Sequence, residues 1–243
     1  MPILSERDKL GQKIMSRFNK ASKDLGLIED GDHLLVGVSG GNDSLCLLEM
    51  VGRRMRIHRP SFTADAVHIR MENIKYETDT AYVSDFAARY NIPLHVVATS
   101  FEPRAGSRKS PCFLCSWNRR KQMFTLAQRL GCNKIALGHH SDDIIHTTLM
   151  NLLYQGHFST MPARLQMRKM PLAIIRPLCL TAEADIKAYA SMRGYEAQVR
   201  RCPYEDASRR TDARQLFTHI EELAPEARFS ILNALREDGK LTE

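Results

Sequence analysis

Long apolar runs are missing from this chain of 243 residues, although 43% of its residues are hydrophobic. No stretch approaches the roughly 18 uninterrupted apolar residues that a membrane-spanning helix requires, so the sequence predicts no membrane span. Residues 1–9 are mostly charged or polar and contain no apolar signal region, and we therefore expect a cytosolic protein. Internal repeats and low-complexity segments are absent as well. The length suits one large domain, alone or with a small appendage.

Cysteine is also scarce, with six residues in the chain, and a cytosolic protein with so few is not expected to form a disulfide framework. Three of the six stand within apolar or helical patterns and are predicted to be small core residues. They are Cys46, Cys132 and Cys179. The other three stand in basic segments.

Acidic residues are outnumbered, and the net charge is +7. Between Arg104 and Lys121 there are six basic residues and no acidic one, and between His157 and Pro177 there are four lysines or arginines and again no acidic residue. A third basic group, diluted by acidic residues, consists of Arg200, Arg201, Arg209, Arg210 and Arg214. Such clusters are typical of proteins that bind a polyanion, although a solvated basic surface explains the charge equally well.

Short apolar runs alternate with helical patterns along the chain. This alternation predicts an α/β fold with a doubly wound, mainly parallel sheet of about five strands, helices on both faces, and additional N-terminal and C-terminal helices. Residues 156–170 are expected to form a basic loop, and Thr181 is expected to cap the helix that follows it. The last helical segment is expected to break near Pro225. The expected strands are 33–38, 62–69, 94–98, 134–138 and 173–177.

The segment Leu34–Ser44 is the most informative in the chain, because an apolar run ends there in a glycine-paired loop and a helical pattern follows at once. Gly40 and Gly41 permit a positive φ and a close approach of the backbone to a ligand. The free amides of such a loop and the dipole of the next helix favour an anion. The Asp43 carboxylate is placed to hold a metal ion between phosphates. The pattern is not a Walker loop, whose spacing and lysine are missing.

A second polar segment, Leu137–Asp143, stands at another junction from strand to helix. Its two histidines and two carboxylates suit the binding of nucleotide phosphates or of Mg²⁺, which prefers oxygen ligands. Alone, the segment is better explained as a helix cap with a buried histidine, and its pairing with the first loop reverses that preference. Doubly wound sheets bind ligands at the carboxyl ends of their strands, so we expect both loops to meet at one site. The candidate ligand residues in this loop are Gly138, His139, Asp142 and Asp143.

Cys112 and Cys115 form a C-x-x-C motif, which brings two thiols close enough to share a metal or a cluster, or to act in redox chemistry. Cys202 stands in a basic, irregular segment and is the candidate third thiol. Three thiolates are one fewer than the usual set for an iron–sulfur cluster, which would leave one iron open to another ligand. A structural zinc site completed by a histidine and a disulfide-type redox pair remain alternatives.

The segment Ser39–Ser44 resembles the SGGxDS pyrophosphate loop of the PP-loop ATP pyrophosphatase superfamily, whose members cleave ATP between its α and β phosphates and adenylate an acceptor. A C-x-x-C motif, a GHHxDD block and a later cysteine follow in that order. Over residues 10–205 the chain therefore resembles the tRNA 2-thiocytidine synthetase family. Members of that family bind a 4Fe-4S cluster through three cysteines. With Mg-ATP they replace the 2-oxygen of a cytidine in the anticodon loop, at position thirty-two, by sulfur.

The resemblance implies an ATP-dependent tRNA sulfurtransferase with a PP-loop domain over 31–195, preceded by an N-terminal helical segment at 1–30. Residues 196–243 would then hold the third cysteine and a helical tail. By motif position, the catalytic residues are Asp43, which also holds Mg²⁺, and the cluster ligands Cys112, Cys115 and Cys202. The implied ATP ligands are Ser39, Gly40, Gly41, Asn42, Asp43 and Ser44. The implied partners are tRNA, a sulfur donor protein such as a cysteine desulfurase, and a second copy of the chain in a homodimer.

Basic residues near these motifs are the candidates for contacts with the RNA backbone. They are Arg119, Arg120, Lys121, Arg164, Arg168, Lys169 and Arg201. Trp117, the only tryptophan, is expected either to stack on a nucleotide or to be a core aromatic residue.

The chain departs from the family pattern in three ways. His146 replaces a usual glutamate, a single cysteine replaces a second C-x-x-C, and the tail after residue 205 does not match. These departures leave three alternatives open: sulfur transfer to another tRNA base or a small molecule, a nucleotide-binding module with structural zinc, and an amidating or ligating PP-loop enzyme.

Overall fold

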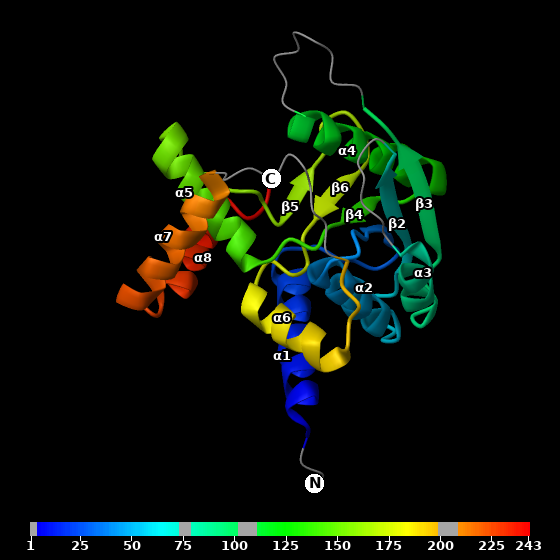
Figure 1. The fold of residues 1–243 in the computed structure, drawn as a ribbon, viewed down its shortest axis with the longest axis horizontal. Helices are drawn as coiled ribbons and strands as arrows, with labels where there is room; N and C mark the ends of the chain where they lie inside the picture. Colours follow the sequence, from blue (N-terminus) through cyan, green and yellow to red (C-terminus); the bar gives the residue numbers. More distant parts are fainter. Residues whose placement is uncertain (1–3, 73–78, 102–110, 199–208) are drawn as a thin grey trace.

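A six-stranded sheet forms the centre of the molecule in the computed structural model, and helices cover both of its faces (Figure 1). The structure describes residues 4–72, 79–101, 111–198 and 209–243, and of residues 111, 112 and 209 it describes the backbone alone. Five strands pair in parallel, and the sixth pairs antiparallel at one edge. The expected doubly wound α/β class is thus confirmed, with one strand more than expected.

The helices and strands alternate along most of the chain. The strands are β1 (His33–Gly37), β2 (Thr63–Met71), β3 (Leu94–Thr99), β4 (Lys134–Ala136), β5 (Arg164–Gln166) and β6 (Ala173–Ile175). The helices are α1 (Glu6–Asp24), α2 (Asn42–Met55), α3 (Thr80–Ala88), α4 (Pro111–Leu130), α5 (Ser141–Gln155), α6 (Glu183–Arg193), α7 (Arg209–Leu223) and α8 (Ala227–Glu237).

The order of the strands, β3-β2-β1-β4-β6-β5, contains a single reversal of winding. From β1 the chain moves outward through β2 to β3, and it then returns to the other side of β1 to form β4 and β6. The reversal lies between β1 and β4, where Val36 pairs with Ala136. Sheets of this kind bind ligands beyond the carboxyl ends of the strands at such a switch point. The loops that follow β1 and β4 therefore border the expected site.

Side chains of β1 alternate between the two faces of the sheet, as the pleat requires. Leu34 and Val36 lie in a buried cluster with residues of α1, α2, α3 and α6, whereas Leu35 lies in a second cluster with residues of α4. A third, smaller cluster joins α5 to α7 and α8 through Ile145, Phe217 and Ala227. These three helices form a group of their own beside the sheet (Figure 1).

Two local expectations are wrong, and both fail because distant segments supply the hydrogen bonds. The expected loop at 156–170 contains β5, whose Arg164 pairs with Ile175 of β6 and accepts a hydrogen bond from the amide of Glu243 at 2.9 Å. The expected cap Thr181 precedes the actual cap residue, Ala182, and the amide of Glu183 donates instead to the Asp142 carboxylate. The break at Pro225 is confirmed, since it separates α7 from α8.

Both ends of the described chain contribute to the main core. Ile14 and Phe18 of α1 and Leu241 near the C-terminus are buried in the same cluster as Leu34. The three cysteines that were expected in the core are buried, as predicted. The division into 1–30, 31–195 and 196–243 stays a prediction. None of the described helices has the length and apolar character that would let it cross a membrane.

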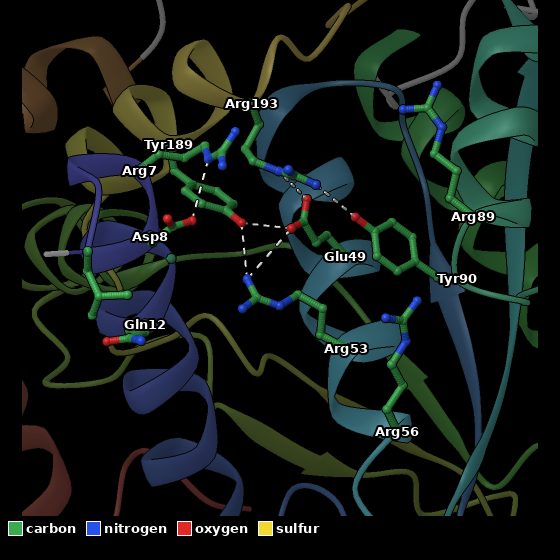
Figure 2. A pocket seen from close by; sticks show the side chains of 12 residues that line it. Arg7, Asp8, Gln12, Glu49, Arg53, Arg56, Arg89, Tyr90, Tyr189 and Arg193 are labelled. Atoms are coloured by element: carbon green, nitrogen blue, oxygen red, sulfur yellow. Dashed lines mark hydrogen bonds and ion pairs between the residues drawn. The ribbon is translucent and has the colours of Figure 1, made fainter. Parts of the chain in front are cut away.

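A buried carboxylate joins α2 to α6. Glu49 is 1% exposed, and its carboxylate accepts hydrogen bonds from the hydroxyl of Tyr189 at 2.7 Å and from Nε of Arg193 at 3.2 Å (Figure 2). The hydroxyl of Tyr195 also donates to it, at 2.8 Å. Burial by itself would raise the pKa of Glu49, but the tyrosine hydroxyls and Arg193 lower it below its ordinary 4.5. Glu49 is therefore held as a carboxylate, and it stabilises the packing of the two helices as long as it stays ionised.

We expect Glu49→Ala to lower the free energy of unfolding by roughly 2–4 kcal/mol, because two hydroxyls and a guanidinium lose their buried acceptor. Urea unfolding at neutral pH measures this change. Because folding depresses the pKa, the stabilisation is fully present above about pH 4.5 and is lost as the pH falls toward the lower value of the folded state. Glu222→Ala, an exposed change on α7, is the control. Equal stability of the two variants would contradict this account.

Candidate functional site

The turn between β1 and α2 gathers hydrogen-bond donors at one point. The amides of Ser39 and Gly40 both donate to the Ser44 hydroxyl oxygen, each at 3.1 Å, and this hydroxyl donates to the carbonyl of Gly41 at 2.9 Å. Gly40 has a φ of 87°, a conformation that a residue with a side chain rarely adopts. Convergent amides of this kind are the arrangement that proteins use to bind phosphate oxygens.

The first turn of α2 adds further donors. Its cap residue is Gly41, which has no side chain that could accept a hydrogen bond from the first amides of the helix. The first amides of the helix therefore lack a side-chain acceptor, and the positive end of the helix dipole lies at the same place. Together with the turn, this helix end forms a site for an anionic group.

The loop after β4 lies directly against this helix end, as expected from the sequence. A Cβ atom built on Gly138 would lie 3.1 Å from the carbonyl carbon and oxygen of Asp43 and 3.2 Å from the amide nitrogen of Ser44. Real Cβ atoms rarely come this close to backbone, so a side chain at residue 138 would require the neighbouring backbone to shift by a few tenths of an ångström. The structure thus brings Ser39–Ser44 and Gly138–Asp143 together at the switch point between β1 and β4.

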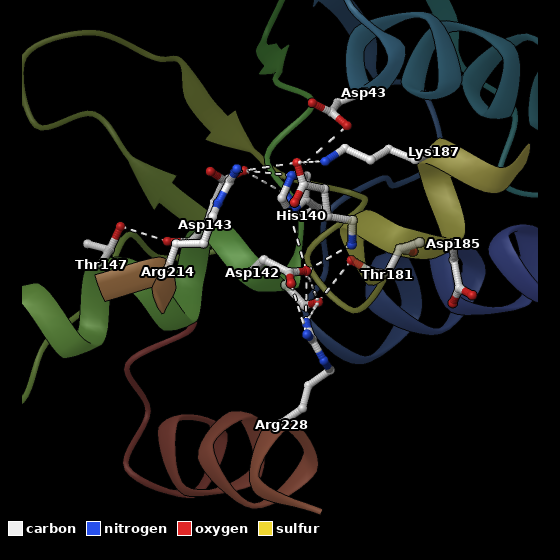
Figure 3. Close-up of polar contacts among 12 residues, drawn as sticks. Asp43, His140, Asp142, Asp143, Thr147, Thr181, Asp185, Lys187, Arg214 and Arg228 are labelled. Atoms are coloured by element: carbon white, nitrogen blue, oxygen red, sulfur yellow. Dashed lines mark hydrogen bonds and ion pairs between the residues drawn. The ribbon is translucent and has the colours of Figure 1, made fainter. Parts of the chain in front are cut away.

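Three carboxylates surround the imidazole of His140, which is 4% exposed (Figure 3). Its Nε2 lies 4.0 Å from an oxygen of Asp43 and 3.5 Å from one of Asp143, and its Nδ1 lies 3.5 Å from one of Asp142. Burial alone would lower the pKa of His140, but the carboxylates raise it above its ordinary value. Burial raises the pKa of Asp43. Negative charge is therefore concentrated where a cation is favoured.

The neighbouring histidine has the opposite character. Burial, followed by the charge of Arg176, lowers the pKa of His139 to about 4. Nε of Arg176 donates to Nδ1 of His139 at 3.2 Å, and Nη1 donates to the carbonyl of Pro162. Because Nδ1 accepts this bond, His139 is neutral near pH 7 and carries its proton on Nε2. The two adjacent histidines thus differ: His139 is a neutral donor, whereas carboxylates raise the pKa of His140.

Asp142 is held by protein groups on both of its oxygens. It accepts hydrogen bonds from the Arg228 guanidinium, at 2.8 and 2.9 Å, from the amide of Glu183 at 2.8 Å and from the hydroxyl of Ser141 at 3.1 Å (Figure 3). Burial would raise the pKa of Asp142, but His140 and Arg228 hold it well below its usual range. In this arrangement Asp142 joins α5 to α6 and α8, whereas Asp43 and Asp143 face Nε2 of His140.

The C-x-x-C motif lies at the beginning of α4. Cys112, Cys115 and Arg119 are spaced i, i+3 and i+7, which places these positions on one face of the helix. Cys115 is half-buried with a free thiol. Arg119 lines a cavity of about 150 Å³ together with Ser39 of the first loop and Leu137 of the second, so this face of α4 borders both loops. Cys202 lies outside the described residues, as does Arg201.

The candidate RNA-binding residues lie in different parts of the structure. Arg120 and Lys121 are exposed on α4, whereas Arg168 and Lys169 lie in the turn that enters β6 at its amino end, away from the two loops. Arg164 lies on β5, at the edge of the sheet.

Trp117 is 51% exposed, with the Lys121 ammonium 5.5 Å from the centre of its ring. The core alternative for this tryptophan is therefore excluded.

Several polar residues at the site were missed by the sequence analysis. Arg176 and Arg228 both contact residues of the second loop, and neither was among the candidate site residues. His146, where the family usually has a glutamate, is buried and packs against Phe217 of α7.

A further cationic region was also missed, because its residues come from three helices (α1, α2 and α6) and from segments beside α1, α2 and α3. The region surrounds a cavity of about 540 Å³ next to Glu49 (Figure 2). Its arginines are Arg7, Arg53, Arg56, Arg89 and Arg193.

Comparisons with known proteins agree with this geometry. A family model for the PP-loop domain matches residues 10–199. A tRNA-cytidine(32) 2-sulfurtransferase from Syntrophotalea carbinolica is 33% identical over 239 residues, which covers 97% of this chain and 92% of the relative. A protein of the same name from Pelobacter propionicus is 33% identical over 235 residues, covering 93% of this chain and 86% of the relative. Among solved structures, the U34-tRNA thiolase NcsA from Methanococcus maripaludis with its 4Fe-4S cluster matches with a TM-score of 0.72 at 19% identity, covering 95% of this chain and 79% of that one.

We expect Gly138→Ala to weaken the binding of ATP by at least about tenfold, because the new methyl group would push the second loop away from Asp43. Isothermal titration of the purified variant with ATP measures the effect. Gly156→Ala, at the end of α5, is the matched control: its φ of 65° makes alanine strained by about 1 kcal/mol, yet nothing lies within 4 Å of the new atom. Equal ATP affinities of the two variants would show that the loops do not need this contact.

Proposed function

Because the chain belongs to the PP-loop family of the tRNA-cytidine(32) 2-sulfurtransferases, we propose that it uses ATP to replace the 2-oxygen of a cytidine in the tRNA anticodon loop by sulfur. One observation carries the proposal: the anion site of Ser39–Ser44 and the polar loop Gly138–Asp143 touch, and the C-x-x-C face of α4 leads to the same place. An enzyme of this kind needs these three parts at one site. A reaction on tRNA also supports a cytoplasmic location.

The first step is adenylation of the base. The 2-oxygen attacks the α-phosphorus of ATP, the bond to the bridging oxygen of the β-phosphate breaks, and pyrophosphate leaves. The amides of the first turn of α2, which lack a capping side chain, and the positive end of that helix dipole stabilise the charge that develops on the pyrophosphate. The Ser44 hydroxyl accepts from the amides of Ser39 and Gly40 and so holds the turn that leads into this helix. His139, neutral and protonated at Nε2, offers a further donor to a phosphate oxygen. The second step forms the new carbon–sulfur bond at C2 and expels AMP. Sulfur enters at the oxidation level of sulfide, so no net oxidant is required.

The donor set near His140 fits Mg²⁺. Asp43 and Asp143 are carboxylates that face the same imidazole nitrogen, and hard cations of this kind prefer oxygen ligands. The raised pKa of His140 indicates an excess of negative charge at this place, which a divalent cation would neutralise. Asp43 and Asp143 would hold the ion, with ATP phosphates supplying further oxygens.

The residues at the beginning of α4 fit a thiolate-bound cluster. Cys112 and Cys115 share a helix face, they stand in the N-terminal part of a helix whose dipole favours negative charge, and the segment from Arg104 to Lys121 contains no acidic residue. Cys202 would be the third ligand. The amide of Gln198, four residues before Cys202, donates to the carbonyl of Gly40 at 2.8 Å. Gln198 is the last described residue before Cys202, and it therefore lies at the loop Ser39–Ser44. When bound, a 4Fe-4S cluster supplies the sulfur chemistry.

An exposed aromatic and basic strip on α4 supports binding of an unstacked nucleotide. Phe113, Trp117 and Lys121 are spaced i, i+4 and i+8 and are all exposed, with Phe113 at 48%. Aromatic side chains beside basic groups bind single-stranded RNA through stacking and phosphate contacts. A homodimeric state and a sulfur donor such as a cysteine desulfurase complete the proposal from the family resemblance. The persulfide sulfur of such a donor reaches the oxidation level of sulfide only with two electrons from a thiol reductant.

Two reciprocal substitutions test the proposal. We expect Asp43→Ala to reduce pyrophosphate release by about 100-fold or more while the bound iron is retained, because only the nucleotide site is changed. We expect Cys202→Ala to abolish thiolation and lose iron while ATP still binds. Pyrophosphate release, iron and acid-labile sulfide, measured on protein purified without oxygen, report the two effects separately.

The matched controls are Asp238→Ala, exposed near the end of α8, and Cys179→Ala, a buried core thiol whose pKa burial raises to about 12. Both controls should keep turnover and iron. Full thiolation by the Cys202 variant would exclude the three-cysteine set, and turnover by the Asp43 variant would exclude the loop as the ATP site. One zinc per chain without sulfide would favour a zinc-containing relative instead.

We expect Trp117→Ala to weaken tRNA binding by about 5–100-fold, since stacking of one base on an aromatic ring contributes roughly 1–3 kcal/mol. ATP affinity should not change. Filter binding measures the dissociation constant. The salt concentration is kept fixed, because phosphate contacts make this constant depend on ionic strength. Phe229→Ala, which removes another exposed aromatic residue on α8, is the control. An unchanged dissociation constant for the Trp117 variant would remove this strip from the RNA interface.

A further inference from the structure

A second group of metal-ligating side chains lies at the opposite end of the sheet from the two loops. His33 is the first residue of β1, Asp65 stands near the beginning of β2, and His95 stands near the beginning of β3. The register pairs Val67 with His95 and His33 with Thr63, so the three side chains come from neighbouring strands at their amino ends. Each stands two residues before Leu35, Val67 or Val97 on its strand and shares that residue's face of the sheet, which is the face that α4 covers.

Cys132 joins this group from the turn between α4 and β4. It is 6% exposed and belongs to the buried cluster on the same face of the sheet. His33, Asp65 and Cys132 each offer one ligand atom, and these atoms all lie within 4.8 Å of one another. A nitrogen, an oxygen and a sulfur ligand therefore converge from two strands and a turn that are far apart in the sequence.

His95 orients the carboxylate of this group. One oxygen of Asp65 lies 2.7 Å from Nε2 of His33, and the other lies 2.7 Å from Nε2 of His95. A hydrogen bond to the second oxygen of a ligating carboxylate is the usual way in which a surrounding residue fixes such a ligand. The carboxylate side chain of Asp65 is 16% exposed and both imidazoles are 29% exposed, so the group is enclosed but reachable from solvent.

The donor types decide which ion fits. Imidazole, carboxylate and thiolate together are a zinc set, whereas the thiolate disfavours Mg²⁺ and Ca²⁺. Tetrahedral zinc with bonds of about 2.0–2.3 Å holds its ligand atoms roughly 3–4 Å apart, so this geometry needs only small side-chain movements. Three protein ligands leave the fourth position of a tetrahedral ion open to water.

We propose that His33, Asp65 and Cys132 bind a zinc ion, with His95 as the residue that positions Asp65. The ion joins the amino ends of β1 and β2 to the turn before β4. It is independent of the proposed thiolation, whose residues lie at the carboxyl ends of the strands and at the beginning of α4. A chain with both groups loaded would contain zinc here and iron at the cysteine trio.

Metal content of site variants tests the proposal. Protein purified without oxygen, equilibrated with zinc and freed of excess metal should hold one zinc per chain by mass spectrometry. We expect His33→Ala and Cys132→Ser to lose this zinc and to keep their iron. We expect His95→Ala to keep the site with an affinity about 10–100-fold weaker, as is typical when a surrounding residue is removed. His219→Ala and Cys46→Ala, which change an exposed histidine and a core thiol elsewhere, are the controls and should keep the zinc.

Cobalt substitution gives a second readout that does not depend on the stability of the variants. In a chain with Cys112, Cys115 and Cys202 all replaced by serine, bound Co²⁺ should show a thiolate charge-transfer band and the visible bands of a tetrahedral ion. Only Cys132 offers a thiolate to that ion. Absence of zinc from the parent protein would overturn the proposal. A zinc content and a cobalt spectrum that Cys132→Ser leaves unchanged would overturn it as well. The group would then be a hydrogen-bonded carboxylate with two histidines beside a core thiol.

Discussion

A backbone contact without side chains determines the geometry of the candidate site. Because residue 138 is glycine, the loop after β4 lies against the carbonyl of Asp43 and the amide of Ser44 at a distance that a Cβ atom would rarely adopt. The contact stands where the winding of the sheet reverses between β1 and β4. It brings the amides of the first loop, the carboxylates of both loops and the neutral His139 into one region. The proposed nucleotide chemistry depends on that proximity.

Buried charges outside the two loops hold this arrangement in place. Arg176 fixes the tautomer of His139, and Arg228 pairs with Asp142 and so ties α8 to the beginning of α5. Asp142 also accepts the amide at the beginning of α6. Removing one partner of a buried pair leaves the other charge without compensation, so these contacts are costly to break. Helices from distant parts of the sequence therefore support a site that is formed by loops.

Local sequence patterns predicted the parts of the structure that local chemistry determines. The strand, glycine turn and helix at Leu34–Ser44 are marked by composition and periodicity, and the meeting of the two loops followed from the rule for doubly wound sheets. β5 could not be predicted, because its three residues become a strand only through pairing with β6 and with the C-terminal residues. The capping of α6 by Asp142 instead of Thr181 has the same origin.

Long-range contacts also explain which site residues were missed. Arg228 lies 86 residues from Asp142 in the sequence, and no spacing rule relates the two. The arginines around the cavity beside Glu49 come from separate helices and gather only in the folded chain. That Cys202 shares a cluster with Cys112 and Cys115 stays a prediction, since Cys202 lies outside the described residues. The structure shows that Arg119, on the C-x-x-C face of α4, lines a cavity with Ser39 of the first loop. It also shows that Gln198 is hydrogen-bonded to Gly40 of the same loop.

The most direct test of the central claim is the stoichiometry of a single reaction. Protein purified without oxygen would be incubated with unmodified tRNA, Mg-ATP and sulfide, and AMP, pyrophosphate and thiolated nucleosides would be quantified by mass spectrometry. The account predicts equal amounts of AMP, pyrophosphate and 2-thiocytidine, with no product when ATP is omitted. Formation of AMP and pyrophosphate without any thiolated nucleoside, or thiolation that does not require ATP, would contradict it.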